Sequence, residues 1–234
     1  MTPLTLSIIV PVYNEEQTIG ELVERIRAVD IGDIRKDIII SNDGSSDGTR
    51  RVIDQSAWRD DPRVRIYHSE INLGKGAAIR LGLAHAAGDV LLIQDADLEL
   101  DPREYGGLLK PILEDAAQVV YGSRFLRRTV QMPLRTRAAN RLLTWMTNIL
   151  YGARLTDMET GYKVFTHEAL SGIRLRCAGF DFEPEVTAKL LKAGRRIVEV
   201  PIDYRPRRTD EGKKIRWVDG VDAIYVLLRY RFVD

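Results

Sequence analysis

The sequence predicts an α/β fold with a mostly parallel central sheet and helices on both faces. In residues 1–122, short apolar strands alternate with amphipathic helices through short connections, and repeated β-α-β units of this kind build parallel sheets. Three consecutive isoleucines in Asp37–Ser41 are typical of a strand buried on both faces. The 234-residue length and 44% hydrophobic content indicate a single domain with a sizeable core and exclude a disordered chain.

Each element of the first half follows from its local pattern. Short apolar or β-branched runs predict strands at Leu6–Val12, Asp37–Ser41, Arg63–His68, Val90–Gln94 and Val119–Gly122. Apolar spacing of three and four, capping Asp or N-terminal Pro, and terminal Gly predict helices at Glu15–Val29, Asp47–Ser56, Gly74–Ala87 and Pro102–Leu113. Because ligands of parallel sheets bind beyond the carboxyl ends of the strands, the polar loops that follow these strands are the candidate site.

The second half is less regular. We expect helices at Leu134–Tyr151, Glu183–Ala193 and Trp217–Tyr230, a strand at Ile197–Tyr204 and a polar loop at Thr209–Lys214. No repeat, low-complexity tract or linker separates the halves, so residues 1–234 are interpreted as one domain.

Charge is divided unevenly between the halves. Residues 1–120 carry 13 Lys and Arg against 21 Asp and Glu, whereas residues 121–234 carry 22 against 13, so net charges of −8 and +9 give the total of +1. This asymmetry fits a site that holds a cation on one side and anions on the other; chance surface patterning is the alternative.

The single cysteine, Cys177, excludes an internal disulfide and a cysteine-cluster metal site and suits a cytosolic protein. The N-terminus has no signal-peptide pattern, and no apolar run approaches the roughly 20 residues of a membrane helix. We therefore expect a cytoplasmic protein whose membrane role, if any, is peripheral at the inner face of the membrane or through an integral-membrane partner.

The sharpest chemical signal is Asp95-Ala96-Asp97, directly after a predicted strand. In extended backbone, residues two apart point the same way at roughly 6–7 Å, so both carboxylates can bind one hard cation. Glu99 continues the spacing as a candidate third ligand. Mg²⁺ or Mn²⁺ held by one or two carboxylates completes its shell with water and substrate phosphates. The alternative is a solvated acidic turn.

Three other loops at predicted strand ends carry weaker signals. In Asn42–Thr49, the Asp43 carboxylate can accept N–H bonds from a nucleobase, or the loop is turn chemistry only. Tyr13 can stack on a base or ribose and Glu15 can bond a hydroxyl, or both belong to a strand-to-helix cap. Asn72–Gly76 fits neither the P-loop nor the dinucleotide fingerprint; we interpret it as a helix entry, and a nucleotide contact through Lys75 is the alternative.

Basic residues dominate residues 116–156, which contain no acidic residue. Arg124 follows a predicted strand, and Arg137 and Arg141 share a helix face, so together they can clamp a phosphate dianion. Nucleic acid is discounted, since aromatic residues are not interleaved with these arginines. Asp157, beyond the basic stretch, is either a base or acceptor-orienting group or one partner of a structural salt bridge. No hydrolase triad is present among the scattered histidines.

In order, Pro-x-Tyr-Asn-Glu, Asp-Gly-Ser-Ser-Asp-Gly-Thr, Asn-x-Gly-Lys-Gly, Asp-Ala-Asp-Leu, Gly-Ser-Arg and Asp-x-x-Thr-Gly-Tyr-Lys resemble family 2 glycosyltransferases with the GT-A fold. The similarity is greatest to dolichyl-phosphate mannose synthases and bacterial polyprenyl-phosphate glycosyltransferases, and runs from Leu6 to about Trp217. It implies a nucleotide-binding half, residues 1–122, and an acceptor half, residues 123–234, with a mobile loop at 205–214.

The resemblance also implies residue roles. Pro11, Tyr13, Glu15 and Asp43 would hold the nucleoside of the donor; Asp95, the Ala96 backbone and Asp97 would hold the diphosphate and metal; Arg124 would contact phosphate, Arg137 and Arg141 the acceptor phosphate; and Arg208 and Lys214 would close over the donor. Glu99 stands where that subgroup usually has Gln.

The sequence therefore predicts an inverting, Mg²⁺- or Mn²⁺-dependent hexosyltransferase that moves a sugar from a GDP- or UDP-sugar to a polyprenyl phosphate. Such an acceptor is already anionic, so no base is required; with a sugar hydroxyl as acceptor, Asp157 would be the base. Two alternatives stay open: a transferase acting on a soluble saccharide or small-molecule hydroxyl, and a non-catalytic nucleotide-sugar-binding module. The amphipathic pattern of Leu134–Tyr151 and of the last helix indicates either membrane contact or packing on the sheet.

Overall fold

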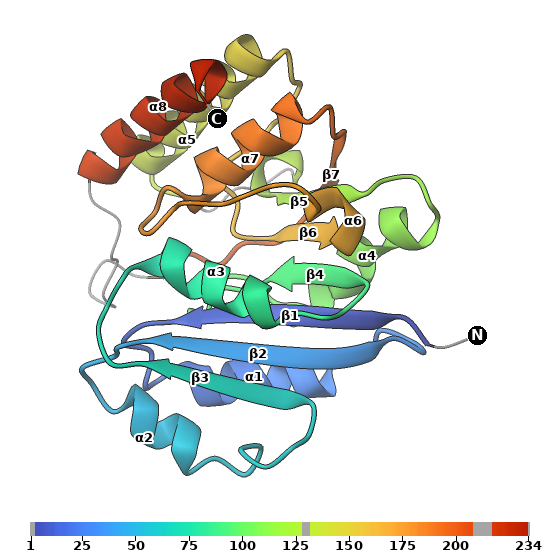
Figure 1. Ribbon diagram of the computed structural model, residues 1–234, viewed down its shortest axis with the longest axis vertical. Coiled ribbons are helices and arrows are strands. Elements are labelled where there is room, and N and C mark those ends of the chain that lie inside the picture. The colour runs from blue at the N-terminus through green and yellow to red at the C-terminus, as the bar shows by residue number, and fades with distance from the viewer. Residues whose placement is uncertain (1–2, 128–131, 208–216, 234) are drawn as a thin grey trace.

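One seven-stranded sheet organises the computed structural model, which describes residues 3–127, 132–207 and 217–233 (Figure 1). The strand order is β3-β2-β1-β4-β6-β5-β7. Every pairing is parallel except those of β6, which runs antiparallel to β4 and to β5. The strands are β1 (Thr5–Val12), β2 (Arg35–Asp43), β3 (Val64–Ser69), β4 (Val90–Ile93), β5 (Val119–Ser123), β6 (Lys163–Thr166) and β7 (Ile197–Pro201).

Alternate side chains of the buried strands feed two cores, one on each face of the sheet. On one face, Ile8 and Ile40 pack with α1 (Ile19–Ala28), α2 (Thr49–Asp54) and α4 (Tyr105–Leu113). On the other, Ile9 and Ile39 pack with α3 (Lys75–His85), α6 (His167–Leu170) and α7 (Phe182–Lys192). Two 3₁₀ turns, η1 (Pro102–Glu104) and η2 (Arg124–Leu126), follow β4 and β5.

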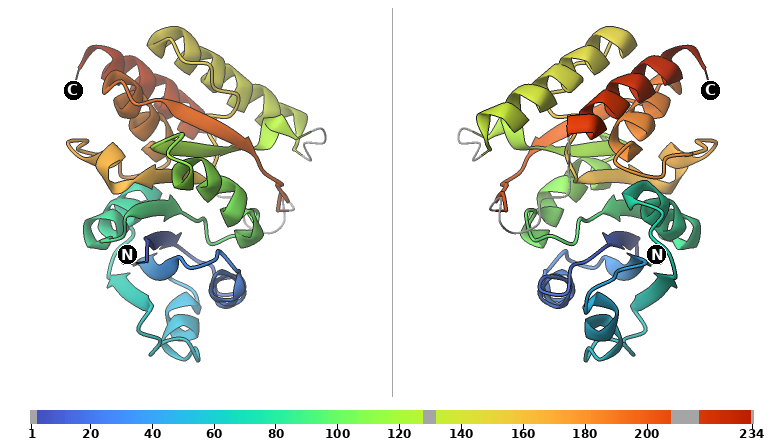
Figure 2. Two further views of the ribbon diagram at one scale, coloured as in Figure 1. Left: turned by 90° about the vertical axis from the view of Figure 1, so that its right-hand side faces the viewer. Right: turned by 90° about the vertical axis from the view of Figure 1, so that its left-hand side faces the viewer.

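Two long helices form a further layer beyond α7. α5 (Leu134–Tyr151) and α8 (Trp217–Phe232) lie side by side at the end of the molecule opposite α2 and β3 (Figures 1 and 2). Leu143 of α5 packs with Ala223 and Leu227 of α8, and Tyr151 donates a hydrogen bond to the Leu227 carbonyl at 2.6 Å. No helix among the described residues combines the length and apolar character needed to cross a bilayer.

The predicted α/β fold is confirmed, and the expected helices and strands are present with shifts at their ends. Glu15–Thr18 form a turn before α1, in which the Thr18 backbone N–H bonds to the Glu15 carbonyl at 3.1 Å. β6 was not predicted. It begins at Lys163, the last residue of a segment interpreted only for its chemistry, and four residues with a buried lysine at the start carry no strand pattern.

Candidate active site

The acidic pair predicted to bind a metal lies at the carboxyl end of β4. Asp95 and Asp97 follow the buried strand directly, with the buried Ala96 between them. Leu98 adopts the left-handed conformation, with φ of 61°, and the Asp97 carboxylate accepts the Glu99 backbone N–H at 3.1 Å. This tight turn gathers three acidic side chains at one edge of the sheet.

The pKa of the Asp97 carboxyl is strongly raised. Burial raises the pKa of this carboxyl, and the charges of Asp95 and Glu99 raise it further, to about 7, against the opposing effect of Arg207. A carboxylate with two like-charged neighbours is stabilised by a cation. Two carboxylates with open coordination positions also suit Mg²⁺ or Mn²⁺, which retain water and phosphate ligands. Asp95 and Asp97 therefore fit a divalent metal.

Glu99 does not join them as a third ligand. Its carboxylate accepts the Arg207 backbone N–H at 2.9 Å, and its backbone carbonyl accepts the Arg205 N–H at 3.0 Å. Among the described residues, no three acidic, histidine or cysteine side chains converge as a metal site. The prediction of Glu99 as a ligand is thus not supported, because the even spacing assumed extended backbone where the chain turns at Leu98.

Lys75, the first residue of α3, reaches across to the acidic pair. Its ammonium lies 2.8 Å from Asp95 Oδ1 and 2.9 Å from Glu183 Oε1 of α7. Burial lowers the pKa of Lys75, but the two carboxylates outweigh it and keep the pKa raised. The helix-entry interpretation of residues 72–76 is confirmed. In the structure Lys75 holds the Asp95 side chain. The two residues are too far apart in sequence for this contact to be predicted.

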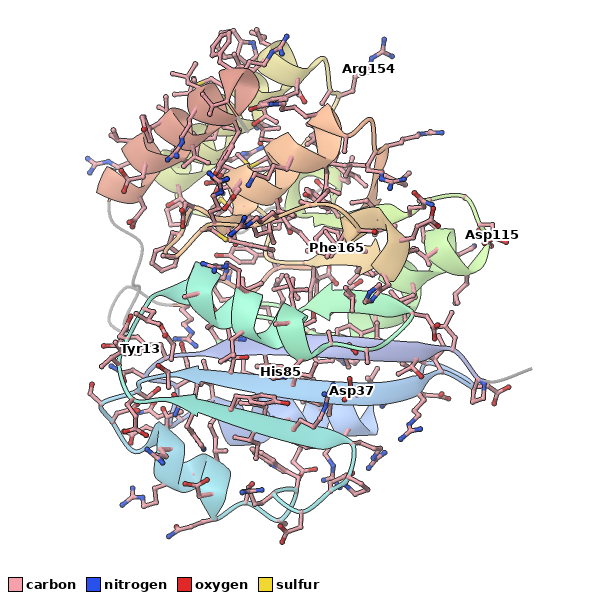
Figure 3. The ribbon with its side chains drawn as sticks, viewed as in Figure 1. Tyr13, Asp37, His85, Asp115, Arg154 and Phe165 are labelled. Atoms are coloured by element: carbon pink, nitrogen blue, oxygen red, sulfur yellow. The ribbon has the colours of Figure 1, made fainter. Side chains whose placement is uncertain are left out.

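The residues expected to hold the nucleoside lie around the ends of β1 and β2. These strands pair in register, with Pro11 opposite Ser41, and Tyr13 lies at this edge in Figure 3, whereas Asp37 lies toward the other end of the sheet. The buried Asp43 carboxylate accepts the backbone N–H groups of Leu73 and Gly74 at 2.9 and 2.7 Å. Asp43 therefore holds the turn into α3; its contact with a base stays a prediction.

Arg207, from the C-terminal part of the chain, contacts residues at this edge of the sheet. Arg207 donates to the Glu15 carboxylate and, through Nε, to the Asp97 carbonyl at 2.9 Å. Sequence reasoning missed Arg207, although it precedes the predicted contact Arg208. Arg208, Lys214 and the rest of the predicted mobile loop beyond residue 207 lie outside the described residues.

Arg124 and Asp157 form a buried bidentate ion pair beside the end of β5. The guanidinium Nε and Nη2 donate to the two carboxylate oxygens at 2.7 and 2.8 Å, and the Arg124 backbone N–H adds a third bond at 3.0 Å. Asp157 is fully buried. Because both carboxylate oxygens are engaged, the structure favours the salt-bridge interpretation of Asp157 over the general base. Tyr204 lies under the guanidinium, 5.3 Å from the ring centre.

Between the acidic pair and this ion pair lies a cluster of buried charges that the sequence did not reveal. The Lys163 ammonium donates to the carbonyls of Met158 and Thr160 at 2.8 and 2.7 Å. Burial lowers its pKa to about 8, partly offset by Glu183 and Glu159. Burial and the Glu183 charge raise the pKa of Glu159 to about 7. The only available signal was the pairing of acidic residues and lysine in the segment 157–163.

Arg137 and Arg141 lie on α5, which begins after η2. The Arg141 guanidinium packs 5.4 Å from the ring centre of Phe125, the residue after Arg124. Arg137 Nε is buried and has no hydrogen-bond partner among the described residues. The structure thus brings Arg141 to the segment of Arg124, and the contact of Arg137 and Arg141 with an acceptor phosphate stays a prediction.

A mostly parallel sheet with paired carboxylates beyond β4 and a buried arginine beyond β5 is the arrangement of a GT-A glycosyltransferase. The sequence signature described as "Glycosyl transferase family 2" matches residues 7–175. The chain belongs to this family and is a glycosyltransferase.

Named relatives and solved structures agree with this assignment. The undecaprenyl-phosphate mannosyltransferase of Micrococcus luteus is 31% identical over 232 residues, covering 93% of this chain and 90% of the relative. Glycosyltransferase AglD of Haloferax volcanii is 28% identical over 225 residues, but the 93% of this chain that matches spans only 36% of it. Glucosyl-3-phosphoglycerate synthase of Mycobacterium tuberculosis, solved with Mn²⁺, UDP and phosphoglyceric acid, has a TM-score of 0.74 at 22% identity, covering 99% and 80% of the two chains. At 22% identity, the similarity to this synthase shows a shared fold only.

Proposed function

We propose that this protein transfers a sugar from a nucleotide-sugar to a polyprenyl phosphate, with a divalent metal held by Asp95 and Asp97. The observation that carries the proposal is the placement of Asp95 and Asp97 beside each other beyond the carboxyl end of β4, where burial and neighbouring carboxylates raise the pKa of Asp97 to about 7. A metal bound there offsets the negative charge that develops on the leaving nucleoside diphosphate. The similarity to the undecaprenyl-phosphate mannosyltransferase of Micrococcus luteus supports the lipid phosphate as acceptor.

The protein's own residues orient the reactants. Lys75 holds Asp95 in place at 2.8 Å, and Arg207 links Glu15 to the Asp97 backbone. Tyr13 and Asp43 are proposed to contact the nucleoside at the ends of β1 and β2.

On the acceptor side, Asp157 fixes the Arg124 guanidinium, and Arg137 and Arg141 supply further positive charge for a phosphate. A phosphate acceptor is already anionic at neutral pH, so no residue has to remove its proton. Attack from the face opposite the leaving diphosphate inverts the anomeric configuration. Arginines that orient the phosphate then contribute more than a base would.

The test is a transfer assay with radiolabelled GDP-mannose, UDP-glucose or other nucleotide-sugars and undecaprenyl or dolichyl phosphate, in Mn²⁺, Mg²⁺ or EDTA. We expect metal-dependent label in the lipid fraction from one donor class, lost in Asp97→Asn. Asp60→Asn, at an exposed position, is the matched control. Transfer that persists in EDTA, or wild-type turnover by Asp97→Asn with metal present, would refute the metal role; transfer only to soluble saccharides would refute the acceptor.

A further inference from the structure

The outer faces of α5 and α8 carry an unusual amount of exposed apolar surface. On α5 the exposed residues Leu142, Trp145 and Ile149 follow one another at spacings of three and four. On α8 a second strip repeats this spacing, formed by Val221, Tyr225, Leu228 and Phe232. Because three- and four-residue steps stay on one side of a helix, each helix presents a continuous apolar strip.

These strips belong to one surface. The two helices pack against each other through Leu143, Ala223 and Leu227, and all views show them side by side at one end of the molecule (Figures 1 and 2). Of the 13 large apolar residues exposed in the described chain, eight lie on α5 or α8. Trp145 is 58% exposed and Phe232 is 81% exposed. An apolar patch concentrated in this way marks an interaction surface.

The charged groups around the strips select the partner. α5 contains three arginines and no acidic residue, and Arg135 and Arg141 are exposed beside its strip. Arg154 projects outward just beyond α5 (Figure 3), and exposed Arg229 and Arg231 flank the end of the α8 strip. In the described part of α8, Asp222 is the one exposed acidic residue, so exposed arginines outnumber exposed acidic residues around the strips. Positive charge around tryptophan, tyrosine and phenylalanine matches an anionic lipid surface.

We infer that the α5–α8 face, meaning the seven strip residues and their flanking arginines, docks this protein on an anionic bilayer. The helices would lie in the plane of the interface, with the strips among the acyl chains and the arginines at the headgroups. A second copy of the chain fits this face less well, since a self-complementary interface would bring arginines toward arginines.

The location of this face also bears on the acceptor, a point that rests on the proposed function. Arg137 and Arg141 lie on α5 itself, so docking would bring the acceptor arginines to headgroup depth. A polyprenyl phosphate could then present its phosphate to Arg137 while its chain stays in the bilayer. Docking itself requires neither donor nor acceptor.

Vesicle flotation tests the docking without any substrate. We expect the full chain to float with vesicles of phosphatidylcholine and phosphatidylglycerol, to bind pure phosphatidylcholine more weakly, and to be released by high salt. Trp145→Gln/Tyr225→Gln/Phe232→Gln should weaken binding by about tenfold or more, because three interfacial side chains are lost. Ile71→Gln/Leu113→Gln, at exposed apolar positions away from this face, should bind as the wild type does.

Absence of wild-type flotation on anionic vesicles, or equal loss in the control variant, would overturn the inference. So would a dimer in sedimentation velocity that the triple variant abolishes while vesicle binding is unchanged. Turnover of a short-chain, water-soluble polyprenyl phosphate separates this inference from the proposed function. We expect the triple variant to retain that turnover, whereas failure of all variants and the wild type there would contradict the function and leave docking intact.

Discussion

The raised pKa of Asp97 predicts a pH dependence of metal binding near neutrality. With a pKa of about 7, the ionised fraction is about one tenth at pH 6 and about nine tenths at pH 8. Because the metal binds the ionised carboxylate and competes with the proton, the apparent metal affinity should be about tenfold lower at pH 6 than at pH 8. An ordinary aspartate with a pKa near 4 would give almost no change over this range.

Free Mn²⁺ measured by electron paramagnetic resonance, without nucleotide, gives this affinity directly. Glu99→Gln removes one of the charges that raise the Asp97 pKa, so its affinity profile should shift to lower pH while metal binding is retained. Asp60→Asn serves as the unshifted control. Equal Mn²⁺ affinity at pH 6 and pH 8 in the wild type would refute the raised pKa of Asp97.

The same pKa has a consequence for stability in the absence of metal. The folded-state value lies above the value of an unfolded aspartate, so the folded state binds the proton more tightly and Asp97 destabilises it as pH rises through about 7. Asp97→Asn should therefore raise the metal-free melting temperature at pH 8 and abolish the increase that Mn²⁺ gives the wild type. A lower metal-free melting temperature in this variant at pH 8 would contradict the reasoning.

Three further substitutions test the surrounding contacts. Gly161→Ala would place its Cβ 2.3 Å from Asp95 Oδ2, so calorimetric Mn²⁺ affinity should fall; unchanged affinity would show that Asp95 can move aside. Lys75→Met should lower the free energy of unfolding in urea by about 3–5 kcal/mol, since it leaves the buried Glu183 and the half-buried Asp95 without this counter-ion. Arg124→Met should cost a similar amount by leaving Asp157 buried and unpaired, and restoration of stability in Arg124→Met/Asp157→Leu would identify that charge as the cause; loss within 1 kcal/mol would mean that the pair behaves as an exposed one.

Local pattern was sufficient to predict most of the fold. Strand and helix runs in residues 1–122 alternate with clear periodicity, and their order dictates a parallel sheet whose carboxyl ends carry Asp95 and Asp97. β6 was not predicted because it is four residues long and lies antiparallel in the sheet, between two strands that precede it in sequence. Its place depends on tertiary pairing rather than on propensity.

The site was predictable in its motifs and not in its pairings. Asp157 was left between base and salt bridge, and only the geometry shows the Arg124 guanidinium engaging both oxygens. Lys75 and Glu183 are 108 residues apart, and no periodicity connects such positions. Arg207 likewise reaches Glu15 from the opposite end of the chain. Contacts of this kind arise from the order of strands in the sheet.

These pairings explain where the site needs a cation. Asp95 has the Lys75 ammonium and Asp157 has the Arg124 guanidinium as direct counter-ions. Among the described residues, the Asp97 carboxylate accepts a hydrogen bond from the Glu99 backbone N–H, while Arg207 donates to the Asp97 carbonyl instead. Asp95 and Asp157 thus have basic side chains as direct partners, whereas Asp97, which also lies beside the charges of Asp95 and Glu99, has a backbone donor. A divalent metal shared with the donor diphosphate would complete this balance, which is why the Asp97 titration is the most direct probe of the proposed chemistry.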